Sequence, residues 1–256
     1  MIANYHTHTA RCLHAVGEDE AYAQRAWEGG LQILGFSDHT PYPFPDGYYS
    51  KMRMYPHQLQ EYADSVLRLK EAYAGKMEIR LGLEAEYYPA FFGELIQMLK
   101  DSQVEYLLLG QHWSGNEIGE IHNARPTEDE AVLRRYCAQV AEAMQTGLFT
   151  YLAHPDMLQF TGDDKVYEKH MRTLCREAKG CDLPLEINLL GLRENRHYPR
   201  TRFWELAAEE GCKVILGCDA HFPVHAWDPE TEQRALALVN ACGLELLQTV
   251  SLRPIK

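Results

Sequence analysis

The sequence predicts an α/β fold in which a parallel sheet is built from repeated strand–helix units. Seven short apolar runs, each typical of a buried strand, alternate along the chain with segments of helical periodicity. No Pro-, Gly- or Ser-rich linker divides the 256 residues, and a single α/β barrel often has this length. We therefore expect one domain that spans residues 1–256.

The expected elements follow one another in the order that βαβ units require. The strands cover Ile2–His6, Gln32–Ser37, Glu78–Glu84, Tyr106–Gln111, Phe149–Ala153, Leu183–Asn188 and Lys213–Gly217. The helices cover Glu18–Glu28, His57–Tyr73, Phe91–Lys100, Glu128–Gln145, Val166–Lys179, Arg202–Glu210 and Glu230–Ala241. Thr127 is the expected cap of the fourth helix, and Gly243 follows the last one. A final apolar piece, Leu244–Val250, is a candidate for an eighth strand.

The composition excludes several classes of function. A net charge of −12 argues against a basic surface that coats nucleic acid. No segment has the pattern of a signal peptide, and no apolar run is long enough to span a bilayer. The seven cysteines are scattered without a Cys-x-x-Cys pair, which is typical of reduced thiols. We expect a cytoplasmic protein, either a monomer or a small homo-oligomer, that does not bind membranes or nucleic acids.

Residues able to bind metal ions or phosphate follow every apolar run. They are His6-Thr7-His8, Ser37-Asp38-His39, Gly82-Leu83-Glu84-Ala85-Glu86, Gly110-Gln111-His112, His154-Pro155-Asp156, Glu186-Ile187-Asn188 and Gly217-Cys218-Asp219-Ala220-His221. In a (β/α) barrel the carboxyl ends of all strands open on one face, where active sites are built. His6 and His8 are two residues apart, so an extended chain presents both imidazoles to one point. This pattern indicates a metal site at that face.

Together with His14, these motifs resemble those of the polymerase-and-histidinol-phosphatase (PHP) superfamily, in the same order and over nearly the whole chain. Three details are closest to its stand-alone histidinol-phosphate phosphatase branch. They are Gly110-Gln111-His112-Trp113, Glu186-Ile187-Asn188 followed by Gly191-Leu192-Arg193, and Tyr198-Pro199. The resemblance implies a distorted (β/α)7 barrel of TIM-like shape with three divalent metal ions in its mouth.

The resemblance also implies which residues hold the metals. The first ion would be bound by His6, His8, Glu84 and Asp219. Glu84 would bridge to a second ion, which is held also by His112 and His154. A third ion would be bound by His14, His39 and His221. A set of imidazoles with few carboxylates suits Zn, Fe or Mn better than Ca or Mg.

Three dications outweigh the charges of Glu84 and Asp219, so the site should attract a phosphomonoester although the protein is acidic. A hydroxide that bridges two metals is the expected nucleophile toward phosphorus. Arg193 is the candidate for neutralising the phosphoryl oxygens, and Arg200 and Arg202 are weaker candidates.

Three further polar residues are candidates for supporting roles. Asp38 either orients His39 or protonates the leaving alkoxide. Asp156 and Asn188 are expected to support the ligands or to contact the substrate. Glu86 either supports a ligand or faces solvent. The remaining histidines are expected at the surface, with His197 and His225 as candidates for lining the mouth.

The expected function is hydrolysis of a small phosphorylated metabolite, and histidinol phosphate of histidine biosynthesis is the favoured substrate. One departure from related phosphatases concerns the substrate: they carry a basic residue where this chain has Met157-Leu158-Gln159-Phe160, and Arg200 replaces a small hydroxyl residue. A second possibility is therefore another ester, such as a sugar phosphate, a nucleotide or phosphotyrosine. Further alternatives are a carbon–nitrogen hydrolase of amidohydrolase type and a metal-binding barrel without catalysis.

Overall fold

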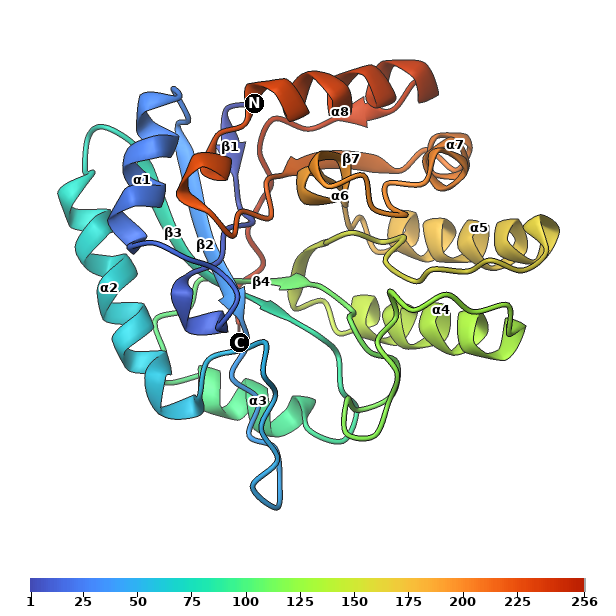
Figure 1. Cartoon of the computed structure of the whole chain (residues 1–256), viewed down its shortest axis with the longest axis horizontal. Coiled ribbons are helices and arrows are strands. Elements are labelled where there is room, and N and C mark those ends of the chain that lie inside the picture. Colours follow the sequence, from blue (N-terminus) through green and yellow to red (C-terminus); the bar gives the residue numbers. More distant parts are fainter. Residues whose placement is uncertain (256) are drawn as a thin grey trace.

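The strands of the computed structural model, which describes residues 1–255, form one parallel sheet with the helices outside it (Figure 1). The strands are β1 (Ala3–Asn4), β2 (Ile33–His39), β3 (Glu78–Ala85), β4 (Tyr106–Leu109), β5 (Phe149–Leu152), β6 (Leu185–Asn188), β7 (Lys213–Gly217) and β8 (Glu245–Leu246). They pair in the order of the sequence, from β1 to β8, and every pairing is parallel. The sheet is therefore the product of successive βαβ units.

The helices alternate with the strands. They are α1 (Asp19–Glu28), α2 (Leu59–Ala72), α3 (Phe92–Leu99), α4 (Glu130–Gln145), α5 (Asp164–Gly180), α6 (Leu189–Arg193), α7 (Thr201–Glu209) and α8 (Pro229–Cys242), with short 3-10 helices η1 (Ala10–Cys12), η2 (Pro56–Gln58) and η3 (Pro223–Ala226). Asp129 caps α4, since its side chain accepts from the N–H of Ala131. The expectation that Thr127 caps this helix is wrong, because Asp129 stands next to the first helical turn and reaches its free N–H group.

The sheet curls so that the segment that follows β1 contacts the segment that follows β7. Thr7 and Ala220 form a parallel bridge, and the N–H of His8 donates to the carbonyl of Ala220 at 3.0 Å. The predicted α/β fold with a distorted TIM-like barrel is thus confirmed. An eighth strand exists as well, but it is only two residues long and pairs with the first residues of β7.

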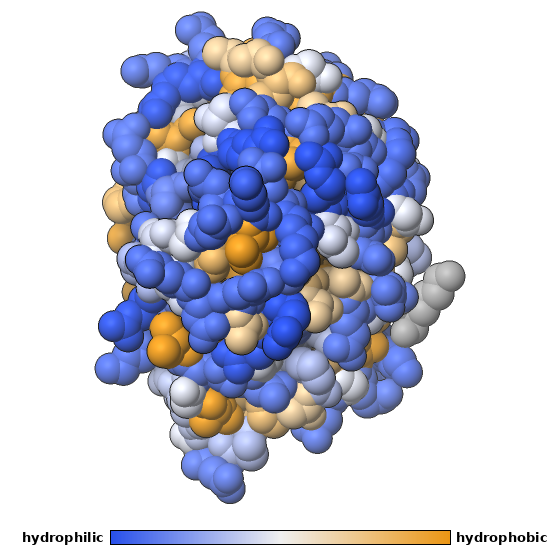
Figure 2. All heavy atoms as spheres, turned by 90° about the vertical axis from the view of Figure 1, so that its right-hand side faces the viewer, coloured by the Kyte–Doolittle hydropathy of each residue, from blue (hydrophilic) through white to orange (hydrophobic). Residues whose placement is uncertain are grey.

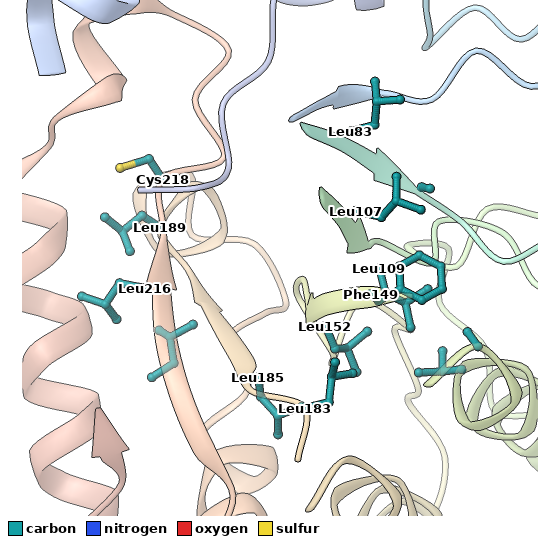
Figure 3. Packing of buried hydrophobic residues seen from close by; sticks show 14 of the residues in the cluster. Leu83, Leu107, Leu109, Phe149, Leu152, Leu183, Leu185, Leu189, Leu216 and Cys218 are labelled. Atoms are coloured by element: carbon teal, nitrogen blue, oxygen red, sulfur yellow. The ribbon is translucent and has the colours of Figure 1, made fainter. Parts of the chain in front are cut away.

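Side chains alternate between the two faces of the sheet, as the pleat requires. Outward residues pack against the helices, and Figure 3 shows Leu107 and Leu216 pointing away from the space that the strands enclose. Inward residues form a second, smaller cluster that includes Tyr5, Tyr106 and Tyr151. The hydroxyl of Tyr106 donates to the carbonyl oxygens of Tyr5 and Phe36 at 2.8 and 3.1 Å. The inside of the barrel is therefore packed below the site.

The surface in Figure 2 is largely hydrophilic, with apolar residues in small separate groups. No helix among residues 1–255 is both long enough and apolar enough to cross a membrane.

Candidate metal centre

The carboxylate of Glu84, near the end of β3, lies among five imidazoles. Its Oε2 atom is 3.5 Å from Nε2 of His6, 3.5 Å from Nε2 of His8 and 3.1 Å from Nδ1 of His39. Its Oε1 atom is 2.8 Å from Nε2 of His154 and 3.6 Å from Nε2 of His112. The pairing of His39 with Glu84 in the β2–β3 register places two of these groups side by side.

Asp219, which follows β7, extends this group of side chains toward the N-terminal loop. Its Oδ1 atom is 3.1 Å from Nε2 of His8 and 3.3 Å from Nδ1 of His221. Nε2 of His221 in turn lies 3.0 Å from Nε2 of His14, which lies two residues after the end of η1. We call the nine side chains the metal centre: His6, His8, His14, His39, Glu84, His112, His154, Asp219 and His221.

The geometry of these residues fits divalent metal ions. Nε2 of His6, Nε2 of His8, Nδ1 of His39 and Oε2 of Glu84 are buried, and although they lie close to one another or to Asp219, none makes a hydrogen bond of good geometry among the described residues. Buried polar atoms without partners are costly, and a cation satisfies several at once. Triads such as His14, His39 and His221, or His6, His8 and Asp219, have ligand atoms within 4.8 Å of one another. Imidazoles combined with carboxylates are typical ligands of zinc, iron and manganese.

The histidines of the centre stabilise the ionised forms of its two carboxylates, Glu84 and Asp219. Burial alone would raise the pKa of Glu84, but the imidazoles of His112 and His6 hold that pKa well below its usual range. Burial likewise opposes ionisation of Asp219, and His6 and His8 lower its pKa well below normal. Both carboxylates are therefore anionic at neutral pH and ready to bind cations.

A family model, the PHP domain, matches residues 4–189 of this chain. The chain belongs to the PHP domain family. Its curated relatives include a probable histidinol-phosphatase of Deinococcus radiodurans, 31% identical over 87% of both chains. The histidinol-phosphatase of Bacillus subtilis is 33% identical, over 84% of this chain and 92% of the relative.

Solved structures agree with the fold of the PHP domain. The histidinol phosphate phosphatase of Lactococcus lactis, solved with zinc, L-histidinol and phosphate, has a TM-score of 0.73 and 20% identity over 97% of this chain and 96% of its own. A putative histidinol phosphatase of Listeria monocytogenes has a TM-score of 0.72 and 19% identity, and the alignment covers 90% of this chain and 99% of that chain. At these identities the likeness establishes the fold alone.

Polar groups behind the centre of the PHP domain orient several of its imidazoles. Nδ1 of His6 is 2.7 Å from Oε1 of Glu186, and Nδ1 of His112 is 2.8 Å from Oε1 of Glu86. Nδ1 of His14 lies 2.8 Å from the carbonyl oxygen of Cys12. Each contact occupies one ring nitrogen and leaves the other for a metal. Sequence reasoning missed the role of Glu186, although its place in Glu186-Ile187-Asn188 at a strand end was a usable signal.

Glycines on neighbouring strands make room for two of the buried carboxylates. A Cβ atom on Gly110 would lie 1.9 Å from Oε1 of Glu84, and one on Gly217 would lie 1.6 Å from Oε1 of Glu186. Both distances are far inside van der Waals contact. Only glycine therefore fits at these two positions while the carboxylates stay where they are.

Asp38 and Asn188 lie behind the centre rather than on the cavity surface. Oδ1 of Asp38 accepts from the backbone N–H of His39 at 2.8 Å and lies 3.4 Å from Nδ1 of His8, while the hydroxyl of Thr9 donates to Oδ2. Nδ2 of Asn188 donates to Asp219 at 3.0 Å. These contacts favour supporting roles over direct contact with a substrate.

The expected phosphate-binding arginines point elsewhere. Arg193 donates to Asp228 at 3.0 Å, and Arg200 donates to Asp164 at 2.8 Å while its guanidinium lies 3.9 Å above the ring of Tyr167. Arg202 pairs with Glu168 and Glu205 at 2.8 Å each. None of the three lines the cavity over the centre.

Asp156, another candidate for a supporting role, is buried, and its Oδ2 atom accepts a hydrogen bond from the backbone N–H of Arg200 at 2.5 Å.

A cavity of 450 Å³ opens above the centre. Its floor is formed by Glu84, Asp219, His14, His39, His112 and His221, and its wall by Met52, His122, Ala124, Met157, Leu190, Glu194, Arg196, His197, Tyr198 and Phe222. His197 lies at the mouth as expected, whereas His225 is not among the lining residues. His122 was expected at the surface and lines the cavity instead, because the loop after β4 folds back onto His112.

Proposed function

We propose that this PHP domain is a metal-dependent phosphomonoesterase that hydrolyses histidinol phosphate, with three divalent ions, zinc, iron or manganese, held by the nine residues of the centre. When bound, such ions polarise the phosphoryl oxygens and lower the pKa of water toward 7. The observation that carries the proposal is the set of buried imidazole and carboxylate atoms without good hydrogen bonds at the floor of an open cavity and directly behind it.

Arg196 is the guanidinium that lines the cavity, and we assign it to the phosphoryl group. It donates to the hydroxyl of Tyr198 at 2.9 Å and pairs with Glu194 at 2.7 Å, and its side chain is 40% exposed. A guanidinium matches two phosphate oxygens at once. Arg193 remains the alternative, and it would have to leave Asp228 to reach a ligand.

The rest of the wall suits an amino alcohol with an aromatic ring. Glu194 is the carboxylate of the wall and can face an ammonium group, and Met157, Leu190 and Phe222 offer apolar surface. Burial and nearby His112 lower the pKa of His122 to about 4, so this imidazole is neutral at pH 7. Its Nδ1 accepts from the N–H of Ala124 at 3.0 Å, which leaves Nε2–H as a donor.

A substrate panel tests the proposal. Protein reconstituted with Zn²⁺ or Mn²⁺ is assayed with histidinol phosphate, phosphotyrosine, a sugar phosphate and a nucleotide. We expect kcat/KM to be highest for histidinol phosphate and the Glu194→Gln variant to lose more with this cationic substrate than with the sugar phosphate. Higher kcat/KM for another ester would contradict the substrate, and no hydrolysis of any ester would contradict the activity.

All seven cysteines are free in the structure. This agrees with a reducing compartment, and we propose that the enzyme acts in the cytoplasm.

A further inference from the structure

Arg53 belongs to the loop between β2 and η2, and its guanidinium is buried beside the metal centre. The side chain is 1% exposed. It donates to Oε2 of Glu86 at 2.9 Å, to Oε1 of Glu86 at 3.2 Å and to the carbonyl oxygen of Thr40 at 3.0 Å. A buried guanidinium bound to both oxygens of one carboxylate holds that carboxylate in a defined orientation.

Glu86 passes this orientation to a residue of the centre. Its side chain is fully buried, and its Oε1 atom lies 2.8 Å from Nδ1 of His112. Carboxylate contacts of this kind fix the ring plane and the tautomer of a ligating histidine. Arg53 thus acts on His112 through one intermediate side chain.

The same guanidinium reaches a second loop, the one between β4 and α4. It donates to Oε2 of Glu117 at 2.5 Å, and this oxygen also accepts from the hydroxyl of Tyr88 at 2.8 Å. Glu117 is 2% exposed and has a φ of 68°, a conformation that its buried side-chain contacts hold in place. Met52, next to Arg53, and His122 and Ala124 of the second loop all line the cavity.

The charges link these loops to the centre. Arg53 carries one positive charge against the two negative charges of Glu86 and Glu117, so the buried trio has a net charge of −1 if both carboxylates are ionised. Cations bound at His112 would lie close to this charge and offset it. We therefore expect the trio to be more stable when the neighbouring centre is occupied.

We propose that Arg53 is a positioning residue that couples the order of both mouth loops, residues 40–55 and 114–124, to metal binding at His112. The proposal rests on the metal centre and not on the identity of the substrate. Because coupling between two sites is reciprocal, ordered loops should strengthen metal binding, and bound metal should order the loops.

Hydrogen exchange of the full chain tests this coupling. Protein stripped of metal is compared with and without Zn²⁺, as wild type, as Arg53→Lys and as Arg172→Lys. Arg172 is the matched control, since it also pairs with two carboxylates, Glu209 and Glu210, but between α5 and α7. In wild type and in the control, Zn²⁺ should slow exchange about tenfold in both loops. In Arg53→Lys this protection should disappear, and the affinity for Zn²⁺ should fall about 10- to 100-fold.

Further variants separate this role from a general effect on folding. Combining Arg53→Lys with His112→Ala should lower Zn²⁺ binding no further than His112→Ala alone. Glu117→Gln should remove the protection of residues 114–124 while that of residues 40–55 remains. Equal protection in Arg53→Lys and wild type would overturn the proposal, as would additive losses in the double variant. If circular dichroism shows that Arg53→Lys and Glu117→Gln are both unfolded, Arg53 serves folding and the proposal fails. Failure of the wild-type protein to hydrolyse histidinol phosphate would contradict only the proposed substrate.

Discussion

The floor and the wall of the cavity differ in how their side chains are held. Behind the floor lie His6 and His8, which are fully buried in the segment that follows β1. Their Nδ1 atoms lie 2.7 Å from Glu186 and 3.4 Å from Asp38, respectively. Arg196 and Glu194 of the wall belong to the loop between α6 and α7, and their side chains are 40% and 45% exposed. The centre is therefore arranged before a ligand enters, whereas the wall can adjust to the ligand.

This difference separates two tasks. Preorganised groups stabilise charge without a cost of rearrangement during the reaction, so the chemistry belongs to the floor. Loops tolerate change, so the choice of substrate belongs to the wall. Variants of the floor should therefore lower metal content and activity toward every ester, and variants of the wall should change the preference among esters.

The largest effect is expected for Glu84→Ala. This change removes the carboxylate that contacts five imidazoles, so metal content should fall and kcat/KM should drop by at least about 10²–10³-fold for all esters. Elemental analysis and steady-state kinetics measure both quantities. Glu94→Ala, in an exposed position of α3, is the control. A Glu84→Ala protein with full metal content would contradict the central place of this residue.

A smaller loss is expected for Glu186→Gln, which lies behind the floor. It replaces the carboxylate that accepts from His6, and such changes typically lower metal affinity or activity about 10- to 100-fold. Competition with a chelator measures the affinity. If the loss were confined to one ester, Glu186 would belong with the wall and the division between floor and wall would fail.

Arg196→Met tests the wall, with Arg193→Met as the paired variant. Loss of a charged hydrogen bond costs about 1.5–3 kcal/mol, so we expect KM for histidinol phosphate to rise about 10- to 100-fold in Arg196→Met with metal content unchanged. The effect of Arg193→Met should be smaller, because Arg193 pairs with Asp228 outside the cavity. A larger rise in KM for Arg193→Met than for Arg196→Met would show that Arg193, and not Arg196, binds the phosphoryl group.

The smallest effect concerns Asp156, which holds the backbone of Arg200 beside the wall. Burial raises the pKa of this carboxyl from 3.8 to about 7. Between pH 4 and pH 7 the unfolded chain loses this proton while the folded chain keeps it, so the residue lowers the free energy of unfolding as pH rises. Asp156→Asn should therefore gain stability relative to wild type as the pH rises from 4 to 7, and the gain should stay constant above pH 7. Denaturant unfolding at several pH values measures this, and a difference that does not vary with pH would refute it.

The sequence predicted the floor better than the wall, for a physical reason. Pairing within a sheet fixes the position of the last residues of each strand. His39 at the end of β2 therefore lies beside Glu84 of β3, because the two residues are paired in the register of these strands. The structure brings all nine expected ligands together, and the role of each as a ligand stays a prediction. The fold and the family are confirmed.

Loop residues have no such register. The direction of Arg193 depends on Asp228, which is 35 positions away in the chain, and that of Arg200 depends on Tyr167 and Asp164. Arg53 was missed because its partners Glu86 and Glu117 come from other segments, so no local pattern in the loop indicates its burial. Contacts of this kind become visible only when the chain is folded.

The glycines beside the two buried carboxylates have a consequence for how this site can evolve. Gly110 and Gly217 carry no functional group, yet a single methyl group at either one would push Glu84 or Glu186 out of place. An inherited change at these positions would damage the chemistry as surely as the loss of a ligand, and a distant descendant that retains every histidine but has lost one of these glycines should be suspected of inactivity.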